Sequence, residues 1–339
     1  MAHMRKKGAA VGAIAVAAAL ALSACGGGAK DDKGTTDQSG GGEAAVEAGE
    51  GVITAAAAYE TTNYDPSTTS SALAICTNWQ LMERLDELDM HTFEPYKALA
   101  ADEDLVEVSD TEYEVTLRDG ATFSDGTEVT SEDVVESYKR ATAEGNLYAS
   151  MLDFIDDITA KDEKTVTVTL SKPFSLVKER LTLIKVIPAS MTQEELTAMP
   201  VGTGPWKYDT ITEEKITFSP NEHYNGDYPA ESSSMVIDII KDDTARTTAL
   251  QEGSVLVMEA VPADARAQLE ASGATVESIQ GFNLPFLMFN TQKAPFDDNR
   301  VRQAVFYAID VEKLIANAMD GEATAATSFL PATHPNYNE

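Results

Sequence analysis

The sequence is poor in the residue types that many catalytic and metal sites need. Of its 339 residues only two are cysteine and four are histidine. Two cysteines exclude a disulfide-dense secreted scaffold. The histidines are widely scattered, at His3, His91, His223 and His334. They leave little material for a histidine-based metal or catalytic cluster, so we predict no metal site and no cofactor.

Basic residues are also scarce. Lysine and arginine number 25 against 56 acidic residues, which gives a net charge of −31. Such a chain repels polyphosphates, and nucleic acid is therefore excluded as its default partner. With 43% hydrophobic and 24% charged residues, most of the chain should be globular. The length suits two or more domains with their own cores, and no internal repeat of solenoid period is present.

Common catalytic motifs are missing as well. The sequence has no Gly-x-Ser-x-Gly elbow, no His-Glu-x-x-His pair and no phosphate loop ending in Gly-Lys-Ser/Thr. Residues 125–128 (Asp-Gly-Thr-Glu) are too sparse for a calcium loop. Residues 202–205 (Gly-Thr-Gly-Pro) lack a following lysine, and their proline removes a backbone donor. We interpret this segment as a sharp turn and predict that the protein is not an enzyme.

The first 24 residues have the organisation of a secretory signal. A basic start, Met1–Lys7, precedes a short alanine-rich apolar run, Gly8–Leu22. The segment Leu22-Ser23-Ala24-Cys25 resembles the bacterial lipobox, in which the cysteine is lipidated and becomes the new N-terminus. We predict a lipoprotein signal peptide over residues 1–24 and a lipid anchor on Cys25, which would hold the protein at the outer face of a membrane. The alternative is an ordinary cleaved signal with an incidental cysteine.

A flexible linker should follow the anchor. Residues 25–51 are rich in glycine and polar residues and nearly free of apolar ones, a composition that cannot bury a core. Cys76 is then left without a partner. Because it follows the apolar run Leu73-Ala74-Ile75, we predict a buried structural thiol.

The remaining chain reads as a mixed order of strands and helices. Alternating or short apolar runs predict strands over residues 52–58, 113–118, 165–170, 235–240 and 284–289. Helical spacing and capping residues predict helices over 73–88, after Thr130, from Asp242 to Gly253, from Pro262 to Gly273, and from Asp297 to Gly321 with a break at Asp310. Arg300 and Arg302 fit poorly at a helix start, so we expect them to pair with carboxylates elsewhere.

Three segments together resemble one protein family. They are residues 117–140 (with Leu-Arg-Asp-Gly and Phe-Ser-Asp-Gly), residues 202–206 with 221–224, and residues 289–310 (with Phe-Asn-Thr-Gln and Tyr-Ala-Ile-Asp). Their order and spacing are similar to those of extracytoplasmic solute-binding proteins of the peptide/nickel class, the receptors of oligopeptide-type ABC importers. We interpret most of these motif residues as markers of the fold. The resemblance implies an α/β fold like that of class II periplasmic binding proteins, with two lobes around a hinge and an extra domain.

The resemblance also implies a division of the chain. Residues 52–82 and 203–281 would form lobe I, residues 83–202 the extra domain, and residues 282–339 the start of lobe III. Members of the family are considerably longer, so we expect lobe III to be incomplete and the chain to be a fragment or the product of a truncated gene. Such a chain should bind ligand weakly or not at all.

Ligand contacts carry over from oligopeptide receptors at three places. The resemblance implies contacts from the segment after the first Asp-Pro turn, from a Tyr-Ala-Ser segment, and from the strand before Phe-Asn-Thr-Gln. The corresponding residues are Ser70, Ser71 and Ala72, then Tyr148, and then Phe282, Asn283 and Phe286. Relatives often have tyrosine at the position of Phe286, which has no hydroxyl group for the corresponding contact. For Phe286 a core position is the alternative.

The implied function is binding without chemistry. Two lobes would close over an extended peptide by a hinge motion, and the closed receptor would deliver it to the membrane permease. We expect a monomer. Another solute in the same fold, such as a nickel chelate, a heme or an oligosaccharide, is the first alternative. A surface lipoprotein hydrolase and a purely structural surface protein are the others.

Overall fold

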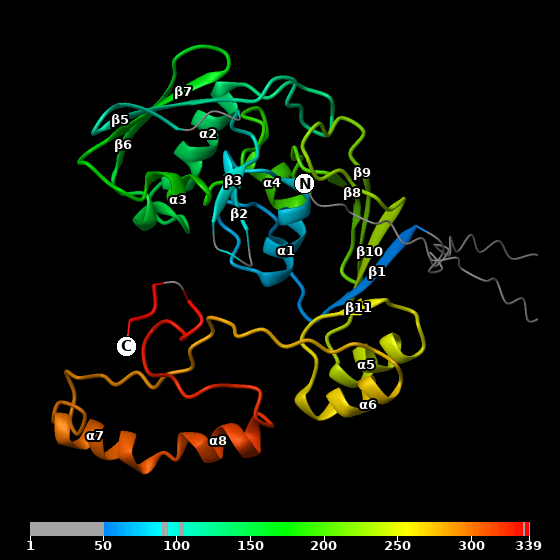
Figure 1. Cartoon of the computed structure of the whole chain (residues 1–339), viewed down its shortest axis with the longest axis vertical. Coiled ribbons are helices and arrows are strands. Elements are labelled where there is room, and N and C mark those ends of the chain that lie inside the picture. Colours follow the sequence, from blue (N-terminus) through cyan, green and yellow to red (C-terminus); the bar gives the residue numbers. More distant parts are fainter. Residues whose placement is uncertain (1–50, 90–91, 93, 102–104, 335, 339) are drawn as a thin grey trace, which may run out of the picture. The chain divides into compact units, whose positions relative to one another are not determined.

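The computed structural model describes residues 51–89, 92, 94–101, 105–334 and 336–338 (Figure 1). The predicted signal peptide, the lipidation site Cys25 and the linker up to residue 50 lie outside the described residues. Within the described ranges, no helix combines the length and the apolar character needed to cross a membrane.

The first sheet has the strand order β11-β1-β10-β9-β8. Its strands are β1 (Val52–Ala57), β8 (Trp206–Ile211), β9 (Lys215–Pro220), β10 (Ser234–Ile239) and β11 (Val257–Met258). Strand β1 is parallel to both of its neighbours, β10 and β11, whereas β9 is antiparallel to β10 and to β8. Strands that run in the same direction in one sheet need crossover connections, and α5 (Asp243–Gln251) lies in the one from β10 to β11, which flank β1. The side chain of Asp242 caps α5, as predicted, by accepting a bond from the Ala245 amide at 2.8 Å.

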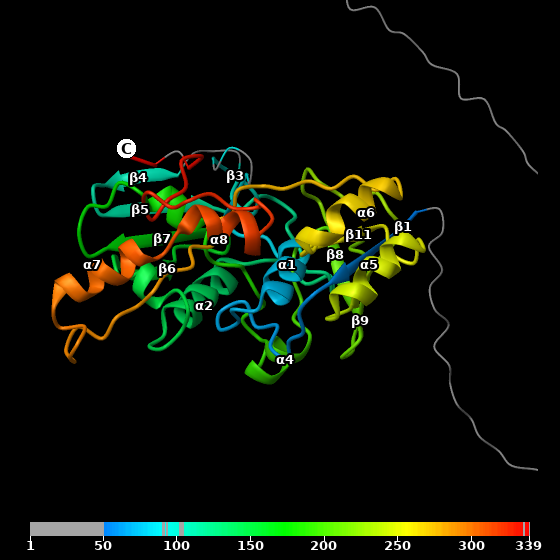
Figure 2. The same ribbon diagram turned by 90° about the horizontal axis from the view of Figure 1, so that it is seen from below.

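Helix α1 (Ala72–Leu81) covers part of this sheet. Its buried face consists of Leu73, Ala74, Thr77, Asn78 and Leu81. The Tyr208 hydroxyl on β8 lies 2.7 Å from Thr77 Oγ1, which joins the helix to the sheet. Figures 1 and 2 show α1 beside the ends of β1 and β11. The core at this place is formed by the apolar residues Ala57, Tyr64, Leu73, Ala74, Leu81, Met82, Ile187, Leu196, Trp206, Tyr208, Ile216, Phe218, Met235 and Ile237.

The predicted helix over 73–88 is too long. The helix ends at Leu81, and Met82 is already extended, with ψ 130°. The Leu81 carbonyl accepts a bond from the Gly204 amide at 2.7 Å, and the Glu83 amide donates to Thr203 Oγ1 at 3.1 Å. These partners, more than a hundred residues away in the chain, replace the bonds that another helical turn would make.

The second sheet has the order β4-β5-β7-β6 and is antiparallel. Its strands are β4 (Val106–Ser109), β5 (Glu112–Thr116), β6 (Ile155–Ala160) and β7 (Thr165–Leu170). The alternation of threonine with Val166, Val168 and Leu170 places the apolar side chains of β7 in the interior, as predicted. Helix α2 (Ser131–Thr142) packs against β6 and β7. Thr130 and Asp133 form its capping box, which confirms the predicted helix start.

The core of this second layer is separate from the first. It includes Leu85, Leu99, Val115, Leu117, Phe123, Val129, Val134, Tyr138, Leu152, Phe154, Ile158, Val166, Val168, Leu170, Leu181, Ile184 and Val186. The chain therefore passes from the first core to the second between Met82 and Leu85 and returns between Val186 and Ile187. Phe123, which we expected under a tight turn, is 1% exposed.

The other elements are short. They are the hairpin of β2 (Asp86–Leu88) and β3 (Pro95–Lys97), and the helices α3 (Val177–Leu181), α4 (Gln193–Ala198) and α6 (Arg266–Ala271). Single 3-10 turns lie at Ala149–Met151 and Ala263–Ala265.

The last described segment differs from the rest. It contains α7 (Asn299–Ala308) and α8 (Val311–Ala318), whose residues are all at least partly exposed (orange in Figure 1). The break near Asp310 was predicted. The strand predicted over 284–289 is absent: these residues form no ladder in the described structure, and Pro285 lacks an amide donor. Arg300 pairs with Asp298 two residues before it, so the expectation of a distant carboxylate is wrong.

Cys76 is the other correction. It is exposed on α1, although we predicted a buried thiol. The reason is geometric. Because α1 buries its Leu73, Ala74 and Thr77 face, the apolar residues Ile75 and Cys76 are turned to the opposite face of the helix.

Candidate ligand site

The predicted residues Ser70, Ser71 and Ala72 stand at the N-terminus of α1. The loop before them is fixed by Asp65, whose side chain accepts bonds from the Ser67 amide at 2.8 Å and the Thr68 hydroxyl at 2.9 Å. Ser70 and Ala72 are exposed and Ser71 is partly exposed. Ser71 occupies the N-cap position, but its side chain makes no capping bond. The ordered loop therefore presents these hydroxyl groups to their surroundings.

Tyr148 lies at the start of the 3-10 turn Ala149–Met151. Its ring is partly buried against the second core. The Leu147 amide donates to the Ser67 carbonyl at 3.4 Å, which joins the Tyr148 loop to the loop before Ser70. Thus two of the three predicted contact regions come from different cores and are brought together.

The third region is placed differently. Phe282 and Phe286 are 50% and 67% exposed, and Asn283 is exposed too. The Phe282 ring packs edge to face on His334 with a centroid distance of 5.3 Å. These residues lie in an extended segment without regular structure, next to the C-terminal residues, and Phe286 is not in a core.

A cluster of buried charges at the crossing between the two cores was not predicted. Arg118 donates two bonds to the Glu83 carboxylate, at 2.9 and 3.0 Å. Lys185 Nζ lies 3.0 Å from Glu87 Oε1, and Arg84 contacts the same carboxylate. The Trp79 ring lies beside the cations of Arg84 and Lys185, at 4.5 and 5.2 Å.

Burial dominates the ionisation of this cluster. It lowers the pKa of Lys185 to about 7, with Arg84 adding to the effect and Glu87 opposing it. Burial also raises the pKa of Glu83, against the effect of Arg118. Burying a charged group away from water costs free energy even when the group has a partner of opposite charge. In the sequence, residues 83–87 look like the polar face of a helix, so only the fold reveals them as buried.

The family-like motifs also meet at this crossing. A Cβ atom on Gly202 would lie 2.1 Å from the Leu81 carbonyl oxygen, and one on Gly204 would lie 2.7 Å from that of Gln80. Only glycine permits so close an approach to the end of α1. The Ser124 amide, in the first motif, donates to the Gly202 carbonyl at 2.9 Å. These residues pack against each other, in agreement with their interpretation as fold markers.

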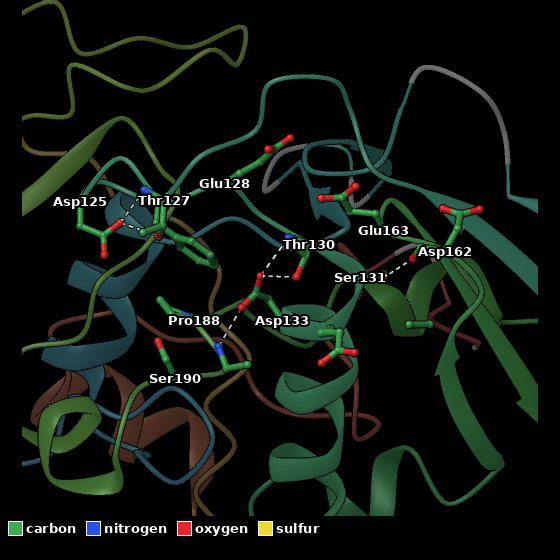
Figure 3. A pocket seen from close by; sticks show the side chains of 14 residues that line it. Asp125, Thr127, Glu128, Thr130, Ser131, Asp133, Asp162, Glu163, Pro188 and Ser190 are labelled. Carbon is green, nitrogen blue, oxygen red and sulfur yellow. Dashed lines mark hydrogen bonds between the residues drawn. The ribbon is translucent and has the colours of Figure 1, made fainter.

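A hollow of about 700 Å³ lies elsewhere, on the second core. It is lined by the Phe123–Glu128 hairpin, the start of α2, residues 160–163 and residues 188–190, and none of the predicted ligand residues lines it (Figure 3). Asp133 in its wall is engaged by Thr130 and by the Ala189 amide. Across the described ranges of the chain, no group of three or more histidine, cysteine or acidic residues is arranged to hold a metal ion.

Comparison with known proteins identifies the family. The sequence model described as "Bacterial extracellular solute-binding proteins, family 5 Middle" matches residues 94–339. The chain belongs to this family of bacterial extracellular solute-binding proteins. This confirms the resemblance, and the fold is that of the periplasmic binding proteins of the family 5 type.

Individual relatives bind different solutes. The chain is 29% identical over 260 residues to the heme-binding protein A of Haemophilus influenzae, covering 67% of this chain and 47% of the relative. It is 26% identical over 291 residues to the dipeptide-binding protein of Escherichia coli, covering 76% and 54%. The chain thus spans about half the length of the curated relatives that it matches.

A solved structure shows the same fold. The protein NikZ of Campylobacter jejuni, solved in complex with Ni(L-His), superposes with a TM-score of 0.72 at 21% identity, covering 83% of this chain and 58% of that one. At this level of identity the likeness concerns the fold alone.

Proposed function

We propose that this protein is the ligand-capturing receptor of an ABC importer and that it binds oligopeptides outside the cytoplasm. The observation that carries the proposal is the bond between the Leu147 amide and the Ser67 carbonyl. It brings the exposed hydroxyl groups before α1 and the Tyr148 loop together from two different cores. Hydroxyl and main-chain groups on ordered loops can pair with the backbone of an extended peptide.

Native mass spectrometry of the protein purified from its own host, with no ligand added, tests this proposal. A series of small masses that fragment as amino acids is expected. A single discrete mass would instead identify a dedicated solute, such as the heme or nickel complexes that relatives bind. That result would overturn the peptide assignment and leave the receptor function intact.

Tyr148 gives a second test. We expect Tyr148→Ala to weaken peptide binding about tenfold and Tyr148→Phe to weaken it less, since a ring and one hydroxyl would both be lost in the first variant. Tyr228, which is 67% exposed outside the predicted site, supplies the matched control. Equal affinities of Tyr148→Ala and Tyr228→Ala in calorimetric titration would remove Tyr148 from the site.

The location of the protein is the last part of the proposal. We infer that the mature protein begins at Cys25 and is held at the membrane by its lipid. Labelling with radioactive palmitate should mark the wild-type protein, and Cys25→Ser should abolish the label and release the protein from the membrane fraction. An unlabelled wild-type protein would favour the ordinary cleaved signal.

A further inference from the structure

The strands β1, β10 and β11 run in parallel in the first sheet, and the residues that directly follow them form a region that we call the corner. None of the predicted ligand residues belongs to it. β1 ends at Ala57, β10 at Ile239 and β11 at Met258. Ligands of α/β folds bind beyond the carboxyl ends of parallel strands. Residues that directly follow these three strands are therefore placed where a solute can reach them.

Glu259 is the first residue after β11. Its Oε1 accepts a bond from the Ala58 amide, directly after β1, at 3.1 Å. The side chain is thereby held across the ends of two neighbouring strands. Its backbone is fixed as well, because the fully buried Arg246 donates to the carbonyls of Glu259 at 3.2 Å and of Ala260 at 2.8 Å.

The turn after Glu259 has an unusual backbone. Ala260 has φ +51°, a left-handed conformation that costs energy for any residue with a Cβ. Its carbonyl bond to the guanidinium of Arg246 offsets part of this cost. Strained backbone that the surroundings hold in place is frequent at binding sites.

The other charges at this corner have partners. Lys241, after β10, pairs with Glu60 at 2.8 Å, and Arg246 pairs with Asp243 at 2.6 Å. The described contacts give Glu259 a backbone amide and no cation, and its side chain is exposed. One fixed carboxylate thus remains available to a positively charged group from outside.

Two exposed apolar side chains belong to residues adjacent in sequence to Ala58 and Cys76, the groups that interact with this carboxylate. Tyr59, the residue after Ala58, is 48% exposed, and Ile75 on α1 is 41% exposed. Partial loss of hydration raises the pKa of the Cys76 thiol on the same helix, and the charge of Glu259 raises this pKa further. A carboxylate beside an aromatic ring and an aliphatic side chain can bind an alkylammonium or guanidinium group.

We infer that Glu259, together with Tyr59 and Ile75, binds a cationic group of the solute and gives the receptor a preference for basic peptides. The inference rests on the proposed function. It adds a specificity-determining residue directly after β11, at the carboxyl ends of the parallel strands.

Titration with two tripeptides tests it. Ala-Lys-Ala and Ala-Leu-Ala share their termini and differ in one side-chain charge. We expect Ala-Lys-Ala to bind the mature protein roughly fivefold more tightly, and Glu259→Gln to remove this difference. Glu252→Gln is the matched control. Glu252 is exposed just after the C-terminus of α5, between this helix and the start of β11, so it lies toward the amino ends of the parallel strands.

The outcomes separate the two proposals. If both peptides bind and Glu259→Gln leaves their ratio unchanged, the inference about Glu259 is overturned and the peptide receptor stands. If neither peptide binds wild-type protein, the peptide function fails and the inference fails with it.

Cys76 provides a readout that needs no ligand. In Cys25→Ser protein it is the one remaining cysteine. Its reaction with a trimethylammonium-bearing methanethiosulfonate should exceed that with the sulfonate-bearing reagent, and Glu259→Gln should reduce this ratio roughly fivefold. An unchanged ratio would show that the carboxylate does not act at this corner.

Discussion

Family motifs occur both at the crossing between the two cores and in the last described segment, which contains α7 and α8. The two regions differ in how far their side chains are buried. At the crossing, Thr203 of the second motif is fully buried, and Glu83, to which it is hydrogen-bonded, is 7% exposed. In the later segment, Phe306 and Tyr307 on α7 are 71% and 84% exposed. A motif therefore identifies the family in both places, but the surroundings decide whether a side chain contributes to stability.

The largest difference should come from the buried ion pair. Arg118→Met leaves the Glu83 carboxylate buried without its cation, and we expect a loss of about 3–5 kcal/mol in the free energy of unfolding. Arg300, in the later segment, pairs with Asp298 at the surface. Arg300→Met should leave the urea midpoint unchanged. Comparable losses in the two variants would contradict the contrast between the regions.

Glycine substitutions should show a similar, smaller contrast. Gly202→Ala places a methyl group against the Leu81 carbonyl, so the backbone must move apart at a cost of about 1–3 kcal/mol. At Gly281 the nearest atom to such a methyl group is 4.0 Å away. Thermal unfolding of Gly281→Ala should match wild type. A wild-type melting temperature for Gly202→Ala would show that the approach to α1 is not close.

The stability of the crossing should depend on pH through Lys185. Its pKa is lowered from 10.5 to about 7 in the folded protein. Between these values the unfolded chain binds more protons, so the free energy of unfolding rises with pH in this window by at most about 1.4 kcal/mol per unit. The free energy of unfolding therefore reaches its highest value only near pH 10.5, the pKa of the unfolded chain. Below pH 7 the lysine is charged in the folded protein as well, and its burial then destabilises the fold most.

Lys185→Met should remove this dependence, because a methionine cannot titrate. The difference between wild-type and variant denaturation midpoints, measured from pH 6 to pH 9, isolates the lysine from the rest of the acidic chain. A difference that does not change with pH would mean that Lys185 keeps its proton throughout.

The smallest effect on stability is expected at Phe286. Because its side chain is 67% exposed, Phe286→Ser should leave the unfolding free energy within about 0.5 kcal/mol of wild type. Binding of a hydrophobic dye should fall, since apolar surface is removed. A strong loss of stability would place Phe286 in a core, the alternative that its sequence context left open.

Local patterns predicted the elements that their own residues stabilise. β7 was predicted with its bounds because threonine alternates with apolar residues, and α2 because Thr130 and Asp133 form a capping box. The turn at Gly253, with φ +77°, ends α5 where the sequence placed it. The helix over 73–88 and the strand over 284–289 failed, since one depends on the distant Gly204 and the other on a pairing partner.

The candidate site likewise combines residues that the sequence identified with a residue that only the fold reveals. The family resemblance named Ser70 and Tyr148, and the fold joins their loops through Leu147 and Ser67. Nothing in the local sequence of Glu259 marks it, because its position depends on β11 lying beside β1.

By itself, the sequence determined the family, the acidic character and those elements whose hydrogen bonds close within a few residues. The tertiary structure decided that α1 ends at Leu81, that the charges of residues 83–87 are buried, and that Cys76 faces outward. The physical reason is that these properties depend on groups contributed by distant segments. The spacing of residues within a segment predicts only which secondary structure the segment can form. Whether its side chains are buried depends on which other segment packs against them.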